Sequence, residues 1–159
     1  MLLIKNGRVI DPSSKTDEIL DILIDGEKII KMGKNIDASK SDIKIIDAAD
    51  LVVTPGLIDV HSHFRDPGFT YKEDILSGAR AAARGGYTTV VCMANTNPVV
   101  DNEETLNYIL NKAKDSKIEI LQVASVTKGL NGTELVNMEK LKEAGAVGFS
   151  DDGKPIMNS

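Results

Sequence analysis

A pair of histidines separated by one residue is the first feature of this 159-residue sequence that could do chemistry. His61 and His63 are the only histidines in the chain, and they end an apolar run that starts at Leu57. Side chains two residues apart on a β-strand project from one face about 6.5 to 7 Å apart, so both imidazoles can reach one ion. Imidazole nitrogen suits zinc and similar divalent metals. The pattern predicts a metal site, and two histidines lining a polar surface are the alternative for an isolated His-x-His motif.

A carboxylate for the same site is available near the end of the chain. Asp151 and Asp152 follow a short apolar run, and either could supply a metal-ligand oxygen. An Asp-Asp-Gly triplet is also a common turn, so both interpretations stay open at this point. Asn95 follows another apolar run, which places it with the other polar residues at the end of a predicted strand.

The elements that must position these residues change in character near residue 50. Residues 1–54 contain short β-branched runs separated by the dipeptides Asn6-Gly7 and Asp25-Gly26, which are typical of tight turns. We therefore expect a small β-sheet unit over residues 1–54.

Residues 55–159 alternate strand-like and helix-like segments. Apolar strand-like runs occupy 57–63, 88–94, 118–124 and 146–150. Helical stripes lie between them, with predicted capping boxes at Thr70/Glu73 and Asp101/Glu104, and a third helix is expected from Thr133 to Glu143, with Leu135 facing inward. Strand–helix–strand repeats of this length predict parallel pairing with right-handed crossovers.

Two α/β architectures share this pattern, the doubly wound sheet and the (β/α)8 barrel. Both bind ligands at the carboxyl ends of their strands, where the polar residues of this chain gather. The glycine-rich loops of nucleotide-binding folds are absent from the strand ends, which favours the barrel. Residues 55–159 supply four strand–helix units, about half of a closed barrel.

Composition excludes several classes of function. The chain has 19 basic and 24 acidic side chains, a formal net charge of -5 and six aromatic residues, which argues against a nucleic-acid partner. No run approaches the roughly 18 to 20 uncharged apolar residues of a membrane span, and no signal peptide is evident. The single cysteine, Cys92, cannot form an internal disulfide or a cysteine-cluster zinc site. We expect a cytoplasmic protein with a small-molecule ligand.

Several spaced motifs resemble the amidohydrolase superfamily, and among its members the bacterial dihydroorotases that are fused to no other enzyme. The matching segments run from Pro55 to His63, His63 to Gly68, Ala83 to Val90, Met93 to Thr96 and Phe149 to Gly153, and Ile4 to Gly7 fits the start of the flanking β-sandwich. The resemblance implies an α/β fold, the N-terminal part of a metal-dependent (β/α)8 hydrolase barrel, with strands of a small β-sandwich over residues 1–54. It also implies reversible interconversion of L-dihydroorotate and N-carbamoyl-L-aspartate in pyrimidine biosynthesis.

The resemblance also assigns roles to individual residues. His61, His63 and Asp152 are implied as ligands of one or two Zn²⁺ ions that activate water for attack on the ring amide. His63, Arg65 and Asn95 are implied on the substrate side, Arg65 as the partner of the substrate carboxylate and Asn95 as a hydrogen-bond donor to it. A solvent-facing salt bridge is the structural alternative for Arg65, and a turn residue for Asn95.

The chain also departs from the family pattern. It reads Met93-Ala94-Asn95-Thr96 where the family usually has Met-Pro-Asn-Thr, and it has no histidine after His63. The family takes two further histidine ligands and a general-base aspartate from later strands, so we expect an incomplete, N-terminal portion with no complete catalytic set.

Other interpretations stay open. A hydantoinase or allantoinase would share the His-x-His strand, but it would give Arg65 no carboxylate to bind, and a hydantoinase would be expected to use a bridging lysine in place of Asp152. An inactive dihydroorotase-like scaffold for aspartate transcarbamoylase, a homo-oligomer, and a split protein completed by a second chain are further possibilities.

Overall fold

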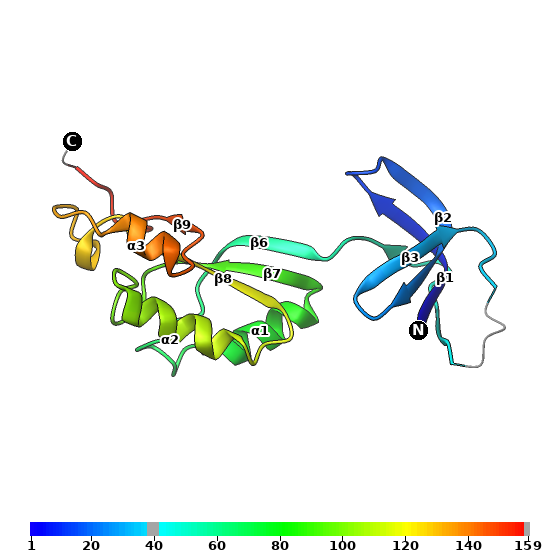
Figure 1. Cartoon of the computed structure of the whole chain (residues 1–159), viewed down its shortest axis with the longest axis horizontal. Helices are drawn as coiled ribbons and strands as arrows, with labels where there is room; N and C mark the ends of the chain where they lie inside the picture. The colour runs from blue at the N-terminus through cyan, green and yellow to red at the C-terminus, as the bar shows by residue number, and fades with distance from the viewer. Residues whose placement is uncertain (38–41, 158–159) are drawn as a thin grey trace. The chain divides into compact units, whose positions relative to one another are not determined.

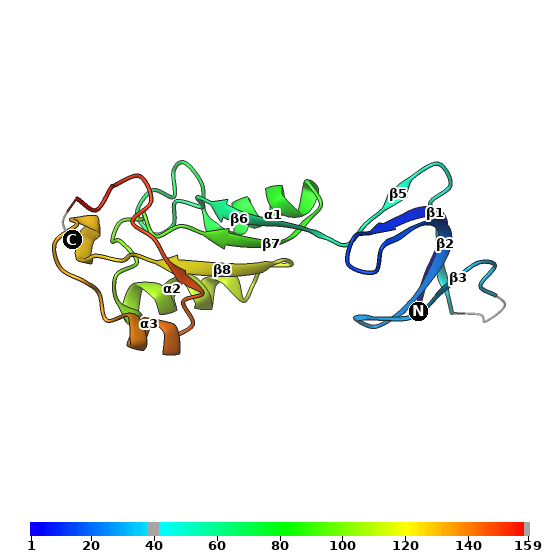
Figure 2. The same cartoon turned by 90° about the horizontal axis from the view of Figure 1, so that it is seen from above.

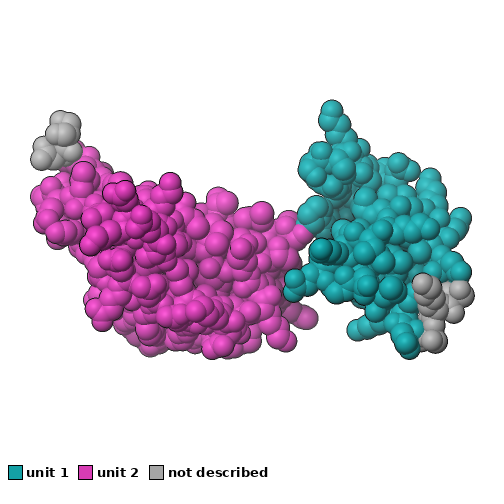
Figure 3. Space-filling view, in the orientation of Figure 1, with its two compact units in different colours: residues 1–55 teal, residues 56–159 magenta. Residues whose placement is uncertain are grey.

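The β-branched runs of the first part of the chain form one sheet. In the computed structural model, which describes residues 1–37 and 42–157, the chain divides into two compact units, Met1–Pro55 and Gly56–Ser159 (Figure 3). The first unit contains β1 (Leu2–Asp11), β2 (Thr16–Asp25), β3 (Lys28–Gly33), β4 (Lys44–Asp47) and β5 (Val52–Val53). Their order is β3-β2-β1-β4, with β5 also paired to β1. The β1–β2 and β2–β3 pairs are antiparallel, whereas β4 and β5 run parallel to β1.

One of the two predicted turns in this unit is confirmed and the other is wrong. Gly26 has a φ of +57° in the connection between β2 and β3, as the Asp25-Gly26 dipeptide predicts. Asn6 and Gly7 lie inside β1, where the register against β2 shifts in the manner of a β-bulge. The buried Asp21 carboxylate accepts hydrogen bonds from the backbone N–H groups of Asn6 and Ile36, both at 2.9 Å. Asn6, with a φ of +63°, therefore forms part of a β-bulge and not of a turn between strands.

The second unit is a parallel sheet with helical crossovers, as the sequence predicts. Its strands are β6 (Leu57–Ser62), β7 (Tyr87–Cys92), β8 (Glu119–Ala124) and β9 (Gly148–Phe149), and its helices are α1 (Ile75–Arg84), α2 (Glu103–Ala113), α3 (Met138–Glu143) and the short 3₁₀ turn η1 (Lys128–Leu130). The strand order is β6-β7-β8-β9, and every neighbouring pair is parallel. Figure 2 shows β6, β7 and β8 side by side, and α1 and α2 lie on the same face of the sheet (Figure 1).

The core of this unit lies between the sheet and its helices. Val90 of β7 is 1% exposed, Leu106 and Ile109 of α2 are 0% and 1% exposed, and Ile75 of α1 is 1% exposed. These residues belong to the helical stripes and strand interiors predicted from periodicity. No helix within residues 1–37 and 42–157 is long and apolar enough to cross a membrane.

The helix starts differ from the predicted capping boxes. Asp74 caps α1, accepting hydrogen bonds from the N–H groups of Leu76 at 2.8 Å and Ser77 at 3.0 Å. Asn102 caps α2 through a hydrogen bond from Thr105 N–H at 2.9 Å. Each predicted cap lay in a run of polar residues, several of which can accept the free N–H groups of a first helical turn.

The third helix is shorter than predicted. It begins at Met138, while the preceding segment is extended, with Val136 N–H bonded to the carbonyl of Val126 at 3.0 Å and Leu135 bridged to Thr127. Leu135 is therefore 65% exposed and does not face the core.

A buried carboxylate anchors the loop that connects β6 to α1. The Asp66 side chain is fully buried and accepts hydrogen bonds from Lys112 Nζ at 2.5 Å, from the Tyr108 hydroxyl at 3.1 Å and from the Ile75 N–H at 3.3 Å. Since Tyr108 and Lys112 belong to α2, this carboxylate ties the loop after β6 to a helix that follows β7.

Replacing Lys112 with Met should lower the free energy of unfolding by about 3 kcal/mol, because it leaves the Asp66 carboxylate buried without its charged partner. Lys114→Met, which alters an exposed lysine just beyond α2, is the matched control and should change the free energy by less than about 0.5 kcal/mol. Urea denaturation at pH 7 measures both variants. Equal losses in the two variants would contradict an anchoring role for the pair.

The hydrogen bond to Asp66 raises the pKa of Lys112 above its usual value. A raised lysine pKa contributes its full stabilisation below the pKa of the unfolded chain, about 10.4, and this contribution is lost as the pH rises through the folded-state pKa. The stability difference between the parent chain and Lys112→Met should therefore be constant up to about pH 9.5 and shrink at higher pH.

Candidate functional site

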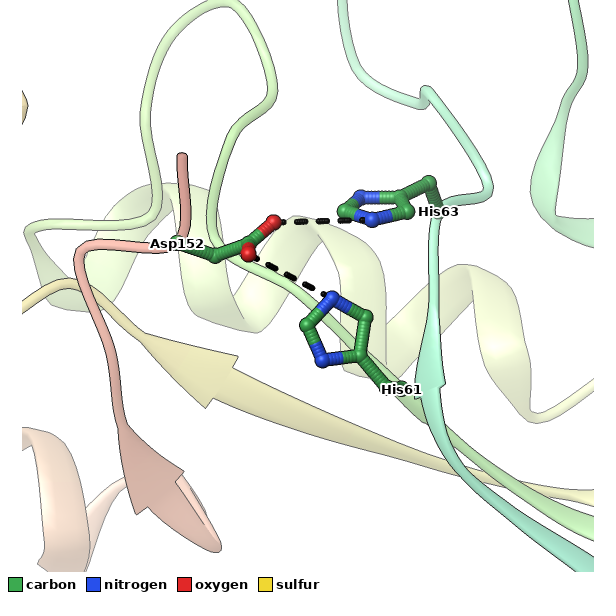
Figure 4. Close-up of side chains that lie close together, drawn as sticks. All are labelled: His61, His63 and Asp152. Carbon is green, nitrogen blue, oxygen red and sulfur yellow. Dashed lines mark ion pairs between the residues drawn. The ribbon is translucent and has the colours of Figure 1, made fainter. Parts of the chain in front are cut away.

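The two histidines and one aspartate come together at the carboxyl ends of β6 and β9. His61 lies near the end of β6, His63 directly follows the strand, and Asp152 lies three residues after β9. His61 Nε2 is 3.4 Å from Asp152 Oδ1, and His63 Nε2 is 3.5 Å from Asp152 Oδ2 (Figure 4). The imidazole centroids are 5.1 Å apart, with the ring planes at 67°. The structure therefore brings together all three residues that were predicted as metal ligands.

The donor atoms of this cluster are the types that a divalent metal prefers. One nitrogen from each histidine and one carboxylate oxygen lie within 4.8 Å of one another. Two imidazoles and a carboxylate match the ligand chemistry of zinc. The two nitrogen–oxygen distances exceed the 2.7 to 3.2 Å range of ordinary N–H···O hydrogen bonds, so direct bonds between the three side chains do not account for their approach. Within the described part of the chain, no other group of this kind is found.

Asn95 lies between His63 and Asp152. Its Oδ1 is 2.9 Å from His63 Nδ1, and its Nδ2 donates a hydrogen bond to Asp152 Oδ2 at 3.4 Å. An amide oxygen can only accept, so this contact favours the proton on Nδ1 and leaves the lone pair of Nε2 directed toward Asp152. The structure thus engages Asn95 with two candidate ligands, a contact that its position after a strand did not reveal.

The adjacent aspartates have different surroundings. Asp151 is 8% exposed, and its Oδ1 accepts hydrogen bonds from the N–H groups of Val126 at 2.7 Å and Thr127 at 3.1 Å. Its Oδ2 accepts a hydrogen bond from the Thr127 hydroxyl. Only Asp152 reaches the histidines, so the geometry separates two residues that the Asp-Asp-Gly motif left equivalent.

Arg65 lies near His63 but makes no hydrogen bond or ion pair with the His61, His63 and Asp152 cluster in the described part of the chain. It shares with His63 the wall of a cavity of about 430 Å³, which is lined by residues of β6, the loop after it, α1 and β7, and Asp152 does not line it. Arg65 has a φ of +57°, and its carbonyl accepts a hydrogen bond from the Phe69 N–H at 2.9 Å. The structure therefore puts Arg65 in the loop after His63 without bringing it into the cluster of three.

Cys92 takes no part in this chemistry. The side chain is buried at the end of β7, and burial raises the pKa of its thiol to about 12. A thiol with that pKa stays protonated at neutral pH, and the thiolate is the form that attacks substrates or binds metals.

Comparisons with known proteins agree with the motifs. The dihydro-orotase-like family model matches residues 50–159. A dihydroorotase of Clostridium acetobutylicum is 68% identical over 159 residues, which cover 100% of this chain and 37% of that protein. The chain thus spans little more than a third of the length of this curated relative.

Solved structures share the fold. An L-hydantoinase (dihydropyrimidinase) from Arthrobacter aurescens superimposes with a TM-score of 0.74 at 25% identity, over 93% of this chain and 32% of that one. A mutant atrazine chlorohydrolase from the same species, complexed with zinc and atraton, gives a TM-score of 0.60 at 26% identity, over 80% of this chain and 36% of that one. The mixed α/β architecture of this chain is therefore shared with part of each of these two enzymes. Together with the family match over residues 50–159, it confirms the family predicted from the motifs: the chain belongs to the dihydro-orotase-like family.

Proposed function

We propose that this chain forms the N-terminal part of a dihydroorotase, which interconverts L-dihydroorotate and N-carbamoyl-L-aspartate in pyrimidine biosynthesis. The observation that carries this proposal is the convergence of His61, His63 and Asp152 at the carboxyl ends of β6 and β9. Identity of 68% to a curated dihydroorotase supports the substrate, since the hydantoinase structure is only 25% identical.

His61, His63 and Asp152 would hold Zn²⁺, as one ion or as part of a two-ion site. The bound metal would supply Lewis-acid chemistry, lowering the pKa of water and polarising the amide carbonyl. The protein residues would provide position: Asn95 Oδ1 fixes the ring of His63, and the two carboxylate oxygens of Asp152 face one histidine each. Hydrogen bonds of this kind from a metal-binding histidine to a neighbouring acceptor set its tautomer and ring orientation.

His63, Arg65 and Asn95 would form the substrate side of the site. Dihydroorotate carries a carboxylate, which the planar guanidinium of Arg65 can bind through two parallel hydrogen bonds. Asn95 Nδ2 has two N–H donors, and the structure uses one of them for Asp152. The second donor is available to a substrate without breaking the contact with His63.

Strands β6 to β9 would be the first four strands of a (β/α)8 barrel, and β1 to β5 would belong to its flanking β-sandwich. Exposed apolar side chains on the open edge strand support this: Ile58 and Val60 of β6 are 62% and 70% exposed. In the first unit, Ile19 and Ile29 are 64% and 60% exposed, as expected for a sheet that lacks its second layer. The remaining metal ligands and the general base would come from later strands of the barrel. Association with aspartate transcarbamoylase stays a prediction.

The 159-residue chain should bind Zn²⁺, and His61→Ala or Asp152→Ala should each weaken binding by at least about tenfold, because each removes one donor of the cluster. Isothermal titration calorimetry measures the affinity, and Asp115→Ala, an exposed carboxylate of the same unit, serves as the control. Unchanged affinity in both cluster variants would remove these residues from the metal site.

Arg65 can be tested in a chimera that joins this chain to the remainder of the Clostridium acetobutylicum dihydroorotase. Arg65→Ala should reduce kcat/KM for dihydroorotate by about 30- to 1,000-fold, equivalent to about 2 to 4 kcal/mol for a charge-assisted pair. Arg80→Ala on the exposed face of α1 is the matched control.

The substrate also separates the two enzyme classes. Dihydrouracil lacks the carboxylate, so its slower hydrolysis should be insensitive to Arg65→Ala. A chimera that preferred dihydrouracil or hydantoin over dihydroorotate would favour the hydantoinase interpretation instead.

A further inference from the structure

The carboxylate next to the candidate ligand Asp152 is buried and fully bonded within the protein. Asp151 is 8% exposed and receives three hydrogen bonds, all from two consecutive residues of the segment that follows β8. Two of these bonds come from backbone N–H groups, those of Val126 and Thr127, and the third comes from the Thr127 hydroxyl. The same hydroxyl oxygen accepts the Gly132 N–H at 2.9 Å, which extends the network to the segment that follows η1.

Asp152 needs such an anchor, because the strand that leads to it is short. β9 contains only Gly148 and Phe149 and lies at the edge of the sheet. Its backbone bonding to the β8 side ends with Ser150 N–H on the Ala124 carbonyl at 2.9 Å. Beyond Ser150, the backbone hydrogen bonds to the β8 side stop, and the side chain of Asp151 provides the connection to the segment after β8.

The two adjacent side chains point in different directions. Asp151 reaches the chain after β8, whereas Asp152 reaches His61 and His63 on β6 and just beyond it (Figure 4). The two residues are adjacent in the chain, so holding the side chain of Asp151 restricts the backbone from which Asp152 projects. A rotation of the backbone at this point would carry the Asp152 oxygens away from both imidazoles.

We propose that Asp151 is a positioning residue: by accepting the N–H groups of Val126 and Thr127, its carboxylate holds Asp152 against His61 and His63. This inference rests on the proposed metal site, to which it adds a residue that does not touch the ion.

The geometry predicts which substitution the position tolerates. Both backbone N–H groups bond to the same oxygen, Oδ1, which asparagine retains as its amide oxygen. The amide nitrogen of Asp151→Asn would replace Oδ2 and can donate to the Thr127 oxygen after the hydroxyl turns. Asp151→Ala removes every one of these bonds and leaves two backbone N–H groups without an acceptor.

The test measures Zn²⁺ affinity and the visible spectrum of bound Co²⁺ in the full 159-residue chain. Asp151→Ala should weaken Zn²⁺ binding by about 10- to 100-fold, the range seen when residues that orient metal ligands are removed, and should alter the Co²⁺ spectrum. Asp151→Asn should stay within about threefold of the parent chain and keep its spectrum. Weakening by Asp151→Asn equal to that by Asp151→Ala would overturn the proposed hydrogen-bonding role.

Asp21→Ala is the matched control. Asp21 is also buried and also accepts two backbone N–H groups, but it lies in the first unit, within β2. It should destabilise the fold without changing metal affinity. If Asp151→Ala fails to fold, Thr127→Val is the second variant: it removes the hydroxyl's bonds to Asp151 and to the Gly132 N–H but keeps both backbone N–H bonds to Asp151. It should give a smaller loss of affinity in a folded chain, and an unchanged affinity would then overturn the proposal.

A metal-free measurement keeps this inference separate from the metal site itself. The NMR signals of the His63 ring and of the Asn95 side-chain amide report whether Asp152 remains in place, since Asn95 contacts both residues. In the apo chain, Asp151→Ala should shift both sets of signals and Asp151→Asn should not. If the parent chain binds no metal and Asp151→Ala still shifts these signals, the result would refute the metal site and support the role of Asp151. Unshifted signals in Asp151→Ala would overturn that role.

Discussion

Hydrogen bonds to two buried carboxylates, Asp66 and Asp151, determine the paths of the loops that carry the candidate site. Each residue lies just past the end of a strand, where backbone ladder bonds stop. Burying an ionised carboxylate without partners costs several kcal/mol, so each loop must keep the donors of its carboxylate in place. Asp66 takes its donors from α1 and α2, and Asp151 takes them from the chain after β8.

The parallel sheet brings these loops to one edge. Strands β6, β7 and β9 run in one direction, so the residues after them converge although His63 and Asp152 are far apart in sequence. Asn95, which follows β7, contacts both His63 and Asp152. The cluster therefore depends on where β6, β7 and β9 end. It also depends on side-chain hydrogen bonds that hold the loop after the short strand β9.

Periodicity predicted the parallel sheet, because it is repeated over many residues, and the His-x-His spacing predicted the two histidines of the cluster, because histidine is rare in this chain. The choice of Asp152 over Asp151 came from the family resemblance. Local choices were harder to predict. Asp74, rather than Thr70, caps α1, since several polar neighbours could accept the same N–H groups. Asn6 and Gly7 form a bulge because Asp21, distant in sequence, binds the Asn6 N–H. Such outcomes depend on tertiary partners, which a local pattern does not contain.

The same difficulty explains why the anchoring residues escaped notice in the sequence. Asp66 follows Arg65 and Asp151 precedes Asp152, so each buried carboxylate stands beside a residue of the proposed site. In sequence, both pairs resemble polar turns, and nothing in their composition distinguishes a buried aspartate from an exposed one. In the structure, one member of each pair bonds to the protein interior. Such an arrangement requires a nearby segment with hydrogen-bond donors for the buried aspartate. The position of a site residue therefore depends on the hydrogen bonds of its buried neighbour as well as on its own side chain.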